Sequence, residues 1–201
     1  RPDCRTLRLP DLPVARRPVM SKALVLIDLQ NDYFPGGRME LVGADDAVRQ
    51  AAGLLDAFRR RSLPVLHVQH LAKRAGATFF LPGTPGAEIH AAVAPQEGER
   101  LVVKHFPNAF RETELLDALR EIGATELTFA GMMTHMCVDT SVRAASDLGF
   151  KCSLAHDACA TRDLKFGASR VAAADVQVAY LAALDGSFAS VRPAAELAAG
   201  T

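Results

Sequence analysis

The stretch ELTFAGMMTHMCVDTSVRAASDLGF, residues 126–150, combines the features that decide the fold of this chain. Its first six residues form a short, mostly apolar run, which is typical of a strand that is buried on both faces. Residues 134–148 then predict a helix, which Gly149 ends. A buried strand that passes through a tight turn into a helix is one unit of an α/β sheet.

The rest of the chain repeats this alternation on both sides of that unit. Apolar runs predict strands at 23–28, 65–69, 101–104, 126–131, 151–157 and 187–191, and helical spacing predicts helices at 44–61, 111–121, 134–148 and 167–184. The pattern favours an α/β fold of three α/β/α layers, with a six-stranded, mainly parallel sheet of Rossmann-like type. Residues 71–100 are rich in Gly and Pro and predict a long loop region, which is usually functional.

The composition excludes several classes of partner. The 201 residues carry 23 Lys and Arg against 23 Asp and Glu, so the formal net charge is zero. This balance gives no electrostatic reason to expect nucleic acid or an anionic membrane surface as a partner. No apolar run approaches the ~20 residues that span a bilayer. We therefore expect one globular domain whose partner is a small molecule, and near-neutrality also permits self-association.

The cysteines and the N-terminal segment bear on compartment and domain limits. The spacing of Cys4, Cys137, Cys152 and Cys159 fits neither a paired metal site nor a dense disulfide framework, which favours a reducing cytoplasm. Residues 1–19 contain five Arg and four Pro and lack the apolar stretch of a secretory signal. We expect them to be an N-terminal extension, either a leader or an arm that packs on a neighbouring subunit, with the domain at 20–201.

Three reactive residues fall where predicted strands end. Asp28 ends the first strand, Lys104 ends the third, and Cys137 lies just beyond the fourth. Each has a structural explanation when taken alone: a helix cap or salt bridge for Asp28, a solvated strand end for Lys104, and a buried thiol for Cys137. In open α/β sheets, however, ligands bind outside the carboxyl ends of the strands. One shared site explains the three positions together.

The surroundings of Cys137 predict a nucleophile. A thiol in the first turn of a helix lies near the positive end of the helix dipole, and this placement predicts a lowered thiol pKa and a thiolate. The same turn directs backbone N–H groups outward, where they can form an oxyanion hole.

Three blocks of the sequence resemble the signature blocks of the isochorismatase-like cysteine hydrolases. They are IDLQNDYF (27–34), KHFPNAF (104–110) and GMMTHMCVDTSVRAASDLGF (131–150). The resemblance covers about residues 20–195 and agrees with the fold class predicted above. Relatives in this superfamily include nicotinamidases, N-carbamoylsarcosine amidase, ureidoacrylate and maleamate amidases, and isochorismatases.

The resemblance implies a role for each matching residue. Asp28, Lys104 and Cys137 correspond to the catalytic triad, and the peptide bond between Met132 and Met133 is expected to be cis. The backbone N–H groups of Met133 and Cys137 correspond to the oxyanion hole. The implied activity is that of an amidohydrolase without a cofactor, which cleaves a C–N bond of a small amide or carbamoyl compound through a thioester on Cys137.

This sequence lacks the motif that forms the metal site of nicotinamidases. Those enzymes carry an Asp-x-His motif, whereas the comparable region reads GADDAVRQ and has no histidine near Asp45. His67 and His70 are better explained as a buried and a pocket-lining histidine, so we expect no metal. The predicted pocket residues are Tyr33, Phe34, His70, Phe106, Phe110 and His135, with core packing as the alternative for each aromatic residue. The family resemblance also implies a homodimer or homotetramer.

Three other functions compete with amide hydrolysis. A vinyl-ether hydrolase of the isochorismatase type can work without a cysteine, and a non-catalytic scaffold of the same fold needs no triad. Cys137 and Arg143 also have the Cys-x5-Arg spacing of cysteine phosphatases. That phosphate loop needs glycine, which CVDTSVR lacks, and Asp139 would repel a phosphate.

Overall fold

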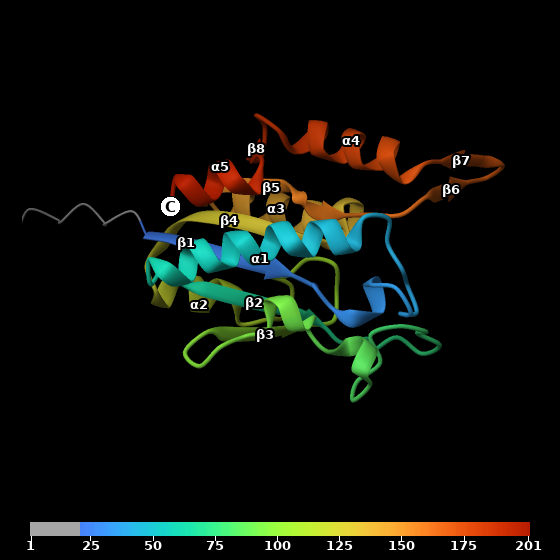
Figure 1. Ribbon diagram of the computed structural model, residues 1–201, viewed down its shortest axis with the longest axis horizontal. Helices are drawn as coiled ribbons and strands as arrows, with labels where there is room; N and C mark the ends of the chain where they lie inside the picture. The colour runs from blue at the N-terminus through green and yellow to red at the C-terminus, as the bar shows by residue number, and fades with distance from the viewer. Residues whose placement is uncertain (1–20) are drawn as a thin grey trace, which may run out of the picture.

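The computed structural model describes residues 21–201, so the predicted extension at 1–19 lies outside the described residues. Its centre is a six-stranded sheet with the strand order β3-β2-β1-β4-β5-β8, in which every neighbouring pair is parallel (Figure 1). The strands are β1 (Ser21–Ile27), β2 (Val65–His70), β3 (Arg100–Lys104), β4 (Ala124–Met132), β5 (Lys151–Ala160) and β8 (Ser190–Arg192). The predicted mainly parallel sheet is confirmed, and β3 and β8 form its edges.

Helices cover both faces of the sheet, because alternate residues of the central strands are apolar on both sides. Leu24 and Leu26 of β1 belong to the core on one face, which is covered by α1 (Ala44–Arg60) and α5 (Ala194–Ala199). Val25 and Ile27 belong to the core on the other face, where α2 (Leu115–Glu121) and α3 (Asp139–Asp147) pack. The three predicted layers are therefore present, with α1 in front of the sheet in Figure 1.

The long loop region between β2 and β3 begins at the carboxyl end of the sheet, and its second half runs back beside α1, where Arg59 binds Ala94 and Glu99. It contains two short 3₁₀ turns, η2 (Pro85–Ala87) and η3 (Ala91–Val93), and a third turn, η1 (Asn31–Tyr33), follows β1. Asp32 joins two of these segments, because its carboxylate accepts backbone hydrogen bonds from Arg38 at 3.2 Å and from Phe80 at 2.6 Å. The predicted loop region 71–100 is thus an ordered cover anchored to the segment after β1.

The predicted helix at 167–184 is wrong in its first six residues. Residues 164–171 form a two-stranded antiparallel hairpin, β6 (Leu164–Phe166) and β7 (Ser169–Val171), and α4 begins only at Ala173 and ends at Leu184. Gly167 has a φ of 59°, a left-handed conformation suited to a turn between two strands. The hairpin projects from the body beside α4 in Figure 1.

Smaller differences concern the ends of elements. The last strand lies at Ser190–Arg192 rather than 187–191, and α5 was not predicted. The predicted helix at 134–148 is divided into a π-helical turn, η4 (Thr134–Val138), followed by α3. Within residues 21–201, no helix combines the length and apolar character needed to cross a membrane.

Candidate active site

The end of β1 carries Asp28 to the carboxyl edge of the sheet. Its backbone N–H donates to the carbonyl oxygen of Val68 at 3.0 Å, and its side chain is fully buried. Its φ of 50° lies in the left-handed region, where residues with a side chain are uncommon and where strain is often found at functional sites. Neither carboxylate oxygen accepts a regular hydrogen bond from a described residue, and Oδ2 lies 2.8 Å from Nζ of Lys104. The carboxylate is thus held by an ion pair.

A glycine brings the neighbouring strand β4 close to this point. Gly131 pairs with Ile27 and has a φ of 140°. A Cβ atom at residue 131 would lie 2.0 Å from the carbonyl oxygen of Ile27, so only glycine permits this approach. The turn that follows β4 consequently reaches the end of β1.

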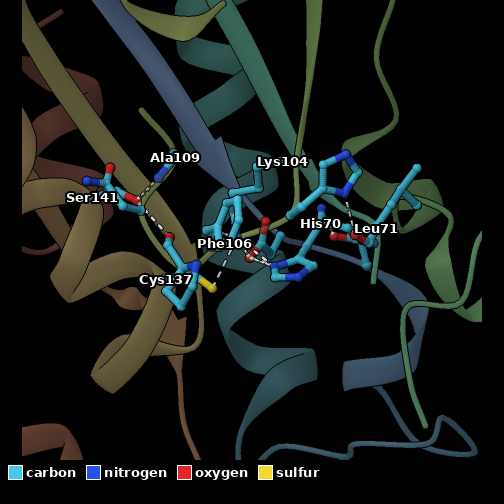
Figure 2. A network of polar contacts seen from close by, with 12 residues as sticks. His70, Leu71, Lys104, Phe106, Ala109, Cys137 and Ser141 are labelled. Atoms are coloured by element: carbon cyan, nitrogen blue, oxygen red, sulfur yellow. Dashed lines mark hydrogen bonds and ion pairs between the residues drawn. The ribbon is translucent and has the colours of Figure 1, made fainter. Parts of the chain in front are cut away.

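Cys137 lies in the π-helical turn between β4 and α3. Val138 donates a backbone hydrogen bond to the carbonyl oxygen of Met133 at 3.2 Å, five residues earlier, which widens this turn. Single π-helical turns are often found at functional sites. The peptide bond between Met132 and Met133 is cis. The side chain of Cys137 is buried and its Sγ points toward Lys104 (Figure 2).

Lys104 is the point at which the three reactive residues meet. The side chain is fully buried, and Nζ lies 2.8 Å from Oδ2 of Asp28 and 3.1 Å from Sγ of Cys137. Nζ also donates to the carbonyl oxygen of Phe106 at 3.1 Å and lies 2.9 Å from Nδ1 of His70. Strand ends that are far apart in the sequence therefore form one buried cluster (Figure 2).

The electrostatics of the cluster correct the prediction of a thiolate. Burial, and then the charge of Asp28, raise the pKa of Cys137 well above its usual value, although Lys104 opposes this shift. The prediction of a lowered pKa from the helix dipole is wrong, because desolvation of a nearly buried thiol outweighs a dipole that ordinarily acts at exposed helix ends. Burial alone would lower the pKa of Lys104, but Asp28 and Cys137 outweigh it and the pKa is raised. The resting cluster is a thiol beside a carboxylate–ammonium pair.

Two buried polar residues that the sequence analysis missed hold the site together. Ser141 of α3 accepts a hydrogen bond from the N–H of Ala109 at 3.0 Å and donates to the carbonyl oxygen of Pro107 at 3.3 Å, as Figure 2 shows in part. This residue joins the segment after Lys104 to the helix after Cys137. The available signal was a serine one turn after the nucleophile, which is too common a feature to single out.

Gln30 is the second of these residues. It is fully buried, its Oε1 accepts the N–H of His70 at 2.7 Å, and its Nε2 donates to the carbonyl oxygen of His70 at 2.9 Å. Nε2 also donates to the carbonyl oxygen of Ala87 at 2.8 Å. These three hydrogen bonds of Gln30 fix the end of β2 and the loop around η2 to the segment after β1.

The six predicted pocket residues have different surroundings. Tyr33 is buried against Phe80, with ring centroids 4.7 Å apart, and burial followed by the charges of Cys137 and Asp28 raises its pKa. His135 is buried and its Nδ1 lies 2.6 Å from Oγ1 of Thr161.

The remaining aromatic residues of the prediction pack against other side chains. The ring of Phe34 lies 4.2 Å from that of His90, and the ring of Phe110 stacks 6.4 Å from Phe150. The ring of Phe106 lies 3.7 Å under the guanidinium of Arg111. Contact of these residues with a substrate stays a prediction.

A cavity of about 320 Å³ lies beside His70, which is also the residue that contacts Lys104. Its lining residues are His70, Ala72, Lys73, Arg74, Ala77, Thr78, Phe79, Phe80, His105 and Pro107. Of the predicted pocket residues, only His70 lines it. Its walls combine two aromatic rings with Lys73 and Arg74, and within residues 21–201 neither cation has a carboxylate within 4.0 Å.

His67 has a structural role, as its position on β2 predicted. It is buried, and Nε2 lies 2.8 Å from Oε2 of Glu99. The guanidinium of Arg59 binds the same carboxylate at 2.7 and 2.8 Å. Burial lowers the pKa of His67, so the histidine is neutral and serves as part of a core network away from the triad.

One group of side chains in residues 21–201 has the composition of a metal site. Ligand atoms of Asp28, His70 and Cys137 lie within 4.8 Å of one another. The ammonium of Lys104 lies among them at 2.8 to 3.1 Å, at the place a metal ion would take. These donors therefore do not fit a resident metal while Lys104 is charged. The sequence expectation of a site without a metal or cofactor stays a prediction.

The comparisons with known proteins agree with the fold. The model of the isochorismatase domain matches residues 22–191. The chain belongs to the isochorismatase family. It is therefore an isochorismatase-family hydrolase by descent, and its Asp28, Lys104 and Cys137 are consistent with the triad that the resemblance implied.

Two relatives extend over most of the chain, and a third extends over about two thirds of it. An uncharacterised isochorismatase family protein, YddQ of Bacillus subtilis, is 47% identical over 173 residues, which are 86% of this chain and 96% of that protein. The crystal structure of a putative isochorismatase hydrolase from Oleispira antarctica is 50% identical with a TM-score of 0.87, covering 90% of this chain and 97% of that one. Maleamate amidohydrolase of Pseudomonas putida is 33% identical over 143 residues, 64% of this chain and 67% of that protein.

Proposed function

We propose that this protein is a cysteine hydrolase that cleaves a C–N bond of a small amide or carbamoyl compound. The observation that carries the proposal is the buried contact of the Cys137 thiol with a carboxylate–ammonium pair, Sγ lying 3.1 Å from Nζ of Lys104. A thiol with a raised pKa needs a base beside it, and Asp28 supplies one. The relationship to maleamate amidohydrolase supports an amide as the substrate.

In the proposed reaction, Asp28 accepts the thiol proton while Sγ of Cys137 attacks the carbonyl carbon of the substrate. The negative charge moves to the carbonyl oxygen, where the backbone N–H groups of Met133 and Cys137 stabilise it. Asp28 then returns the proton to the leaving nitrogen, and the C–N bond breaks. Water, deprotonated by Asp28, hydrolyses the thioester and releases the acid and the free thiol. Lys104 contacts both groups and holds the Asp28 carboxyl group close to the thiol.

The substrate class follows from the cavity beside His70. A space of about 320 Å³ suits a small molecule, and Phe79 and Phe80 offer it an apolar wall. Lys73 and Arg74 at the same cavity would attract a carboxylate or another anionic group. We therefore propose a small amide with an apolar portion and an acidic group. Location in a reducing cytoplasm, which three free cysteines would suit, is part of the proposal.

We further propose that the chain assembles as a homodimer or homotetramer through α4. Val178 on this helix is 68% exposed, and the neighbouring hairpin exposes 89% of Phe166. A helix that is apolar on all sides is ordinarily buried. A second copy of the chain is the occupant we propose, because a net charge of zero opposes self-association least.

The test is a screen for ammonia release across small amides, with and without a carboxylate. We expect turnover by the wild-type protein and its loss by at least about 1,000-fold in Cys137→Ala, since nucleophile removal leaves only binding and oxyanion contributions. Cys152→Ala is the matched control, because Cys152 is also buried but lies on β5 with no triad contact. Undiminished ammonia release by Cys137→Ala would contradict the thioester on Cys137.

A further inference from the structure

His70 lies at the end of β2, directly beside Lys104 in the sheet register. Its Nδ1 is 2.9 Å from Nζ of Lys104 and 4.0 Å from Oδ2 of Asp28 (Figure 2). An imidazole therefore stands in contact with the cation of the cluster, in addition to the carboxylate and the thiol.

The contact with the Lys104 ammonium fixes which nitrogen of the His70 imidazole carries a proton. An ammonium group only donates hydrogen bonds, so Nδ1 must accept, and the single proton of a neutral imidazole must be on Nε2. A protonated ring would bring two cations to 2.9 Å. Burial, followed by the charge of Lys104, lowers the pKa of His70 to about 4, so the ring is neutral across the ordinary pH range.

The position of the ring is itself fixed from two sides. Gln30 holds the backbone N–H and carbonyl of His70 at 2.7 and 2.9 Å, which sets the residue's place at the end of its strand. The ring of Phe80 packs 5.8 Å from the imidazole. A buried glutamine whose amide is hydrogen-bonded at both ends makes the residues that it joins rigid, so the imidazole has little freedom to move.

We propose that His70 is a positioning residue for Lys104: its neutral Nδ1 accepts one ammonium proton and thereby directs the other N–H groups at Asp28 and Cys137. The three N–H bonds of the ammonium face four partners, because Nζ also contacts the carbonyl oxygen of Phe106 at 3.1 Å. Without His70 the group can turn toward Phe106 and away from Sγ, a weak acceptor. The consequence for hydrolysis rests on the proposed function, but the consequence for the thiol does not. Lys104 is the group that opposes the high pKa of Cys137, so loosening it makes thiolate formation harder.

The test compares two replacements of nearly the same size. In His70→Asn, the amide oxygen takes the position of Nδ1 and can still accept, whereas His70→Leu fills the space without an acceptor. The readout is the rate at which iodoacetamide alkylates Cys137 in the full chain at one alkaline pH, resolved by peptide mass spectrometry. We expect this rate to fall about 10-fold in His70→Leu and to stay within about 3-fold in His70→Asn, as for loss of one hydrogen bond to a charged group.

The controls separate positioning from structure. His156→Leu makes the same change on β5, where no side-chain contact joins the histidine to the triad, and should leave the alkylation rate unchanged. For any amide found to be a substrate, His70→Leu should also lower kcat. KM is not a control here, because His70 lines the proposed substrate cavity. If His70→Leu does not fold, His70→Gln replaces it, because its amide lies further out, near the position of Nε2.

Two results would overturn the proposal. One is a wild-type alkylation rate in folded His70→Leu, and the other is an equal loss in folded Asn and Leu variants. Failure of the proposed function is distinguishable from both, because alkylation of Cys137 requires no amide hydrolysis.

Discussion

At the scale of single residues, the site depends on a balance between burial and charge. Cys137 is nearly buried, which alone would leave an inert thiol, as Cys152 and Cys159 illustrate with pKa values raised to about 12. What distinguishes Cys137 is its contact with Lys104, itself in contact with Asp28. The proposed reaction therefore requires transfer of the thiol proton to Asp28 during attack rather than a thiolate that is present beforehand.

This balance predicts that Asp28→Asn changes two measurements in opposite directions: the alkylation of Cys137 becomes faster and amide turnover is lost. The charge of Asp28 raises the pKa of Cys137, so its removal lowers that pKa and yields more thiolate at any pH below it. Alkylation by iodoacetamide should become about 10-fold faster for each unit by which the pKa falls, while amide turnover is lost with the base. Cys152 in the same sample is the internal control. Retained amide turnover would contradict the assignment of Asp28 as the base, and slower alkylation would contradict the effect of its charge on the pKa of Cys137.

At the scale of elements, the approach of β1 and β4 is the feature on which the cluster depends. In Gly131→Ala, the added methyl group meets the backbone of Ile27 at 2.0 Å in a conformation that alanine resists. We expect a loss of at least about 2 kcal/mol in the free energy of unfolding, from overpacking and backbone strain. Denaturant unfolding measures this change in the free energy of unfolding.

The matched control for this change is Gly53→Ala within α1. Residue 53 has open space around its Cβ position and ordinary helical backbone. Alanine should therefore stabilise the protein by about 0.5–1 kcal/mol, the usual gain in a helix interior. Equal effects of the two replacements would mean that the contact between β1 and β4 is looser than described.

The elements also explain how far the sequence could predict the structure. Apolar periodicity located β1, β2 and α1 within a few residues, and strand ends located Asp28, Lys104 and Cys137, because both follow from local pattern and parallel topology. The contact of His70 with Lys104 could not be predicted, since it depends on the register of β2 against β3. Periodicity also failed at residues 167–172, where apolar spacing continues into α4 while Gly167 turns the chain.

At the scale of the whole molecule, the exposed side of α4 leads to a prediction about assembly. We expect the 21.5 kDa chain to sediment as a dimer or tetramer. Val178→Lys should shift it toward the monomer, because a charge placed in an apolar interface is costly unless it is paired.

Ile122→Lys is the control for this change. Ile122 is also a partly exposed apolar residue, 37% exposed, but it lies at the end of α2, far from α4 in Figure 1. Sedimentation velocity measures the oligomeric state of the wild-type protein and of the two variants. A wild-type monomer, or an assembly that Val178→Lys leaves intact, would contradict the proposed interface.

The place of β3 in the sheet has a consequence for how activity is lost under stress. β3 carries Lys104 and has only β2 as a strand neighbour, so its hydrogen bonds, like those of β8 at the other edge, open more easily than those of the central strands. Fraying of this edge would withdraw the cation while β1, β4 and the nucleophile stayed folded. Inactivation by mild heat or denaturant should then precede global unfolding, and early amide exchange in β3 would mark the same event.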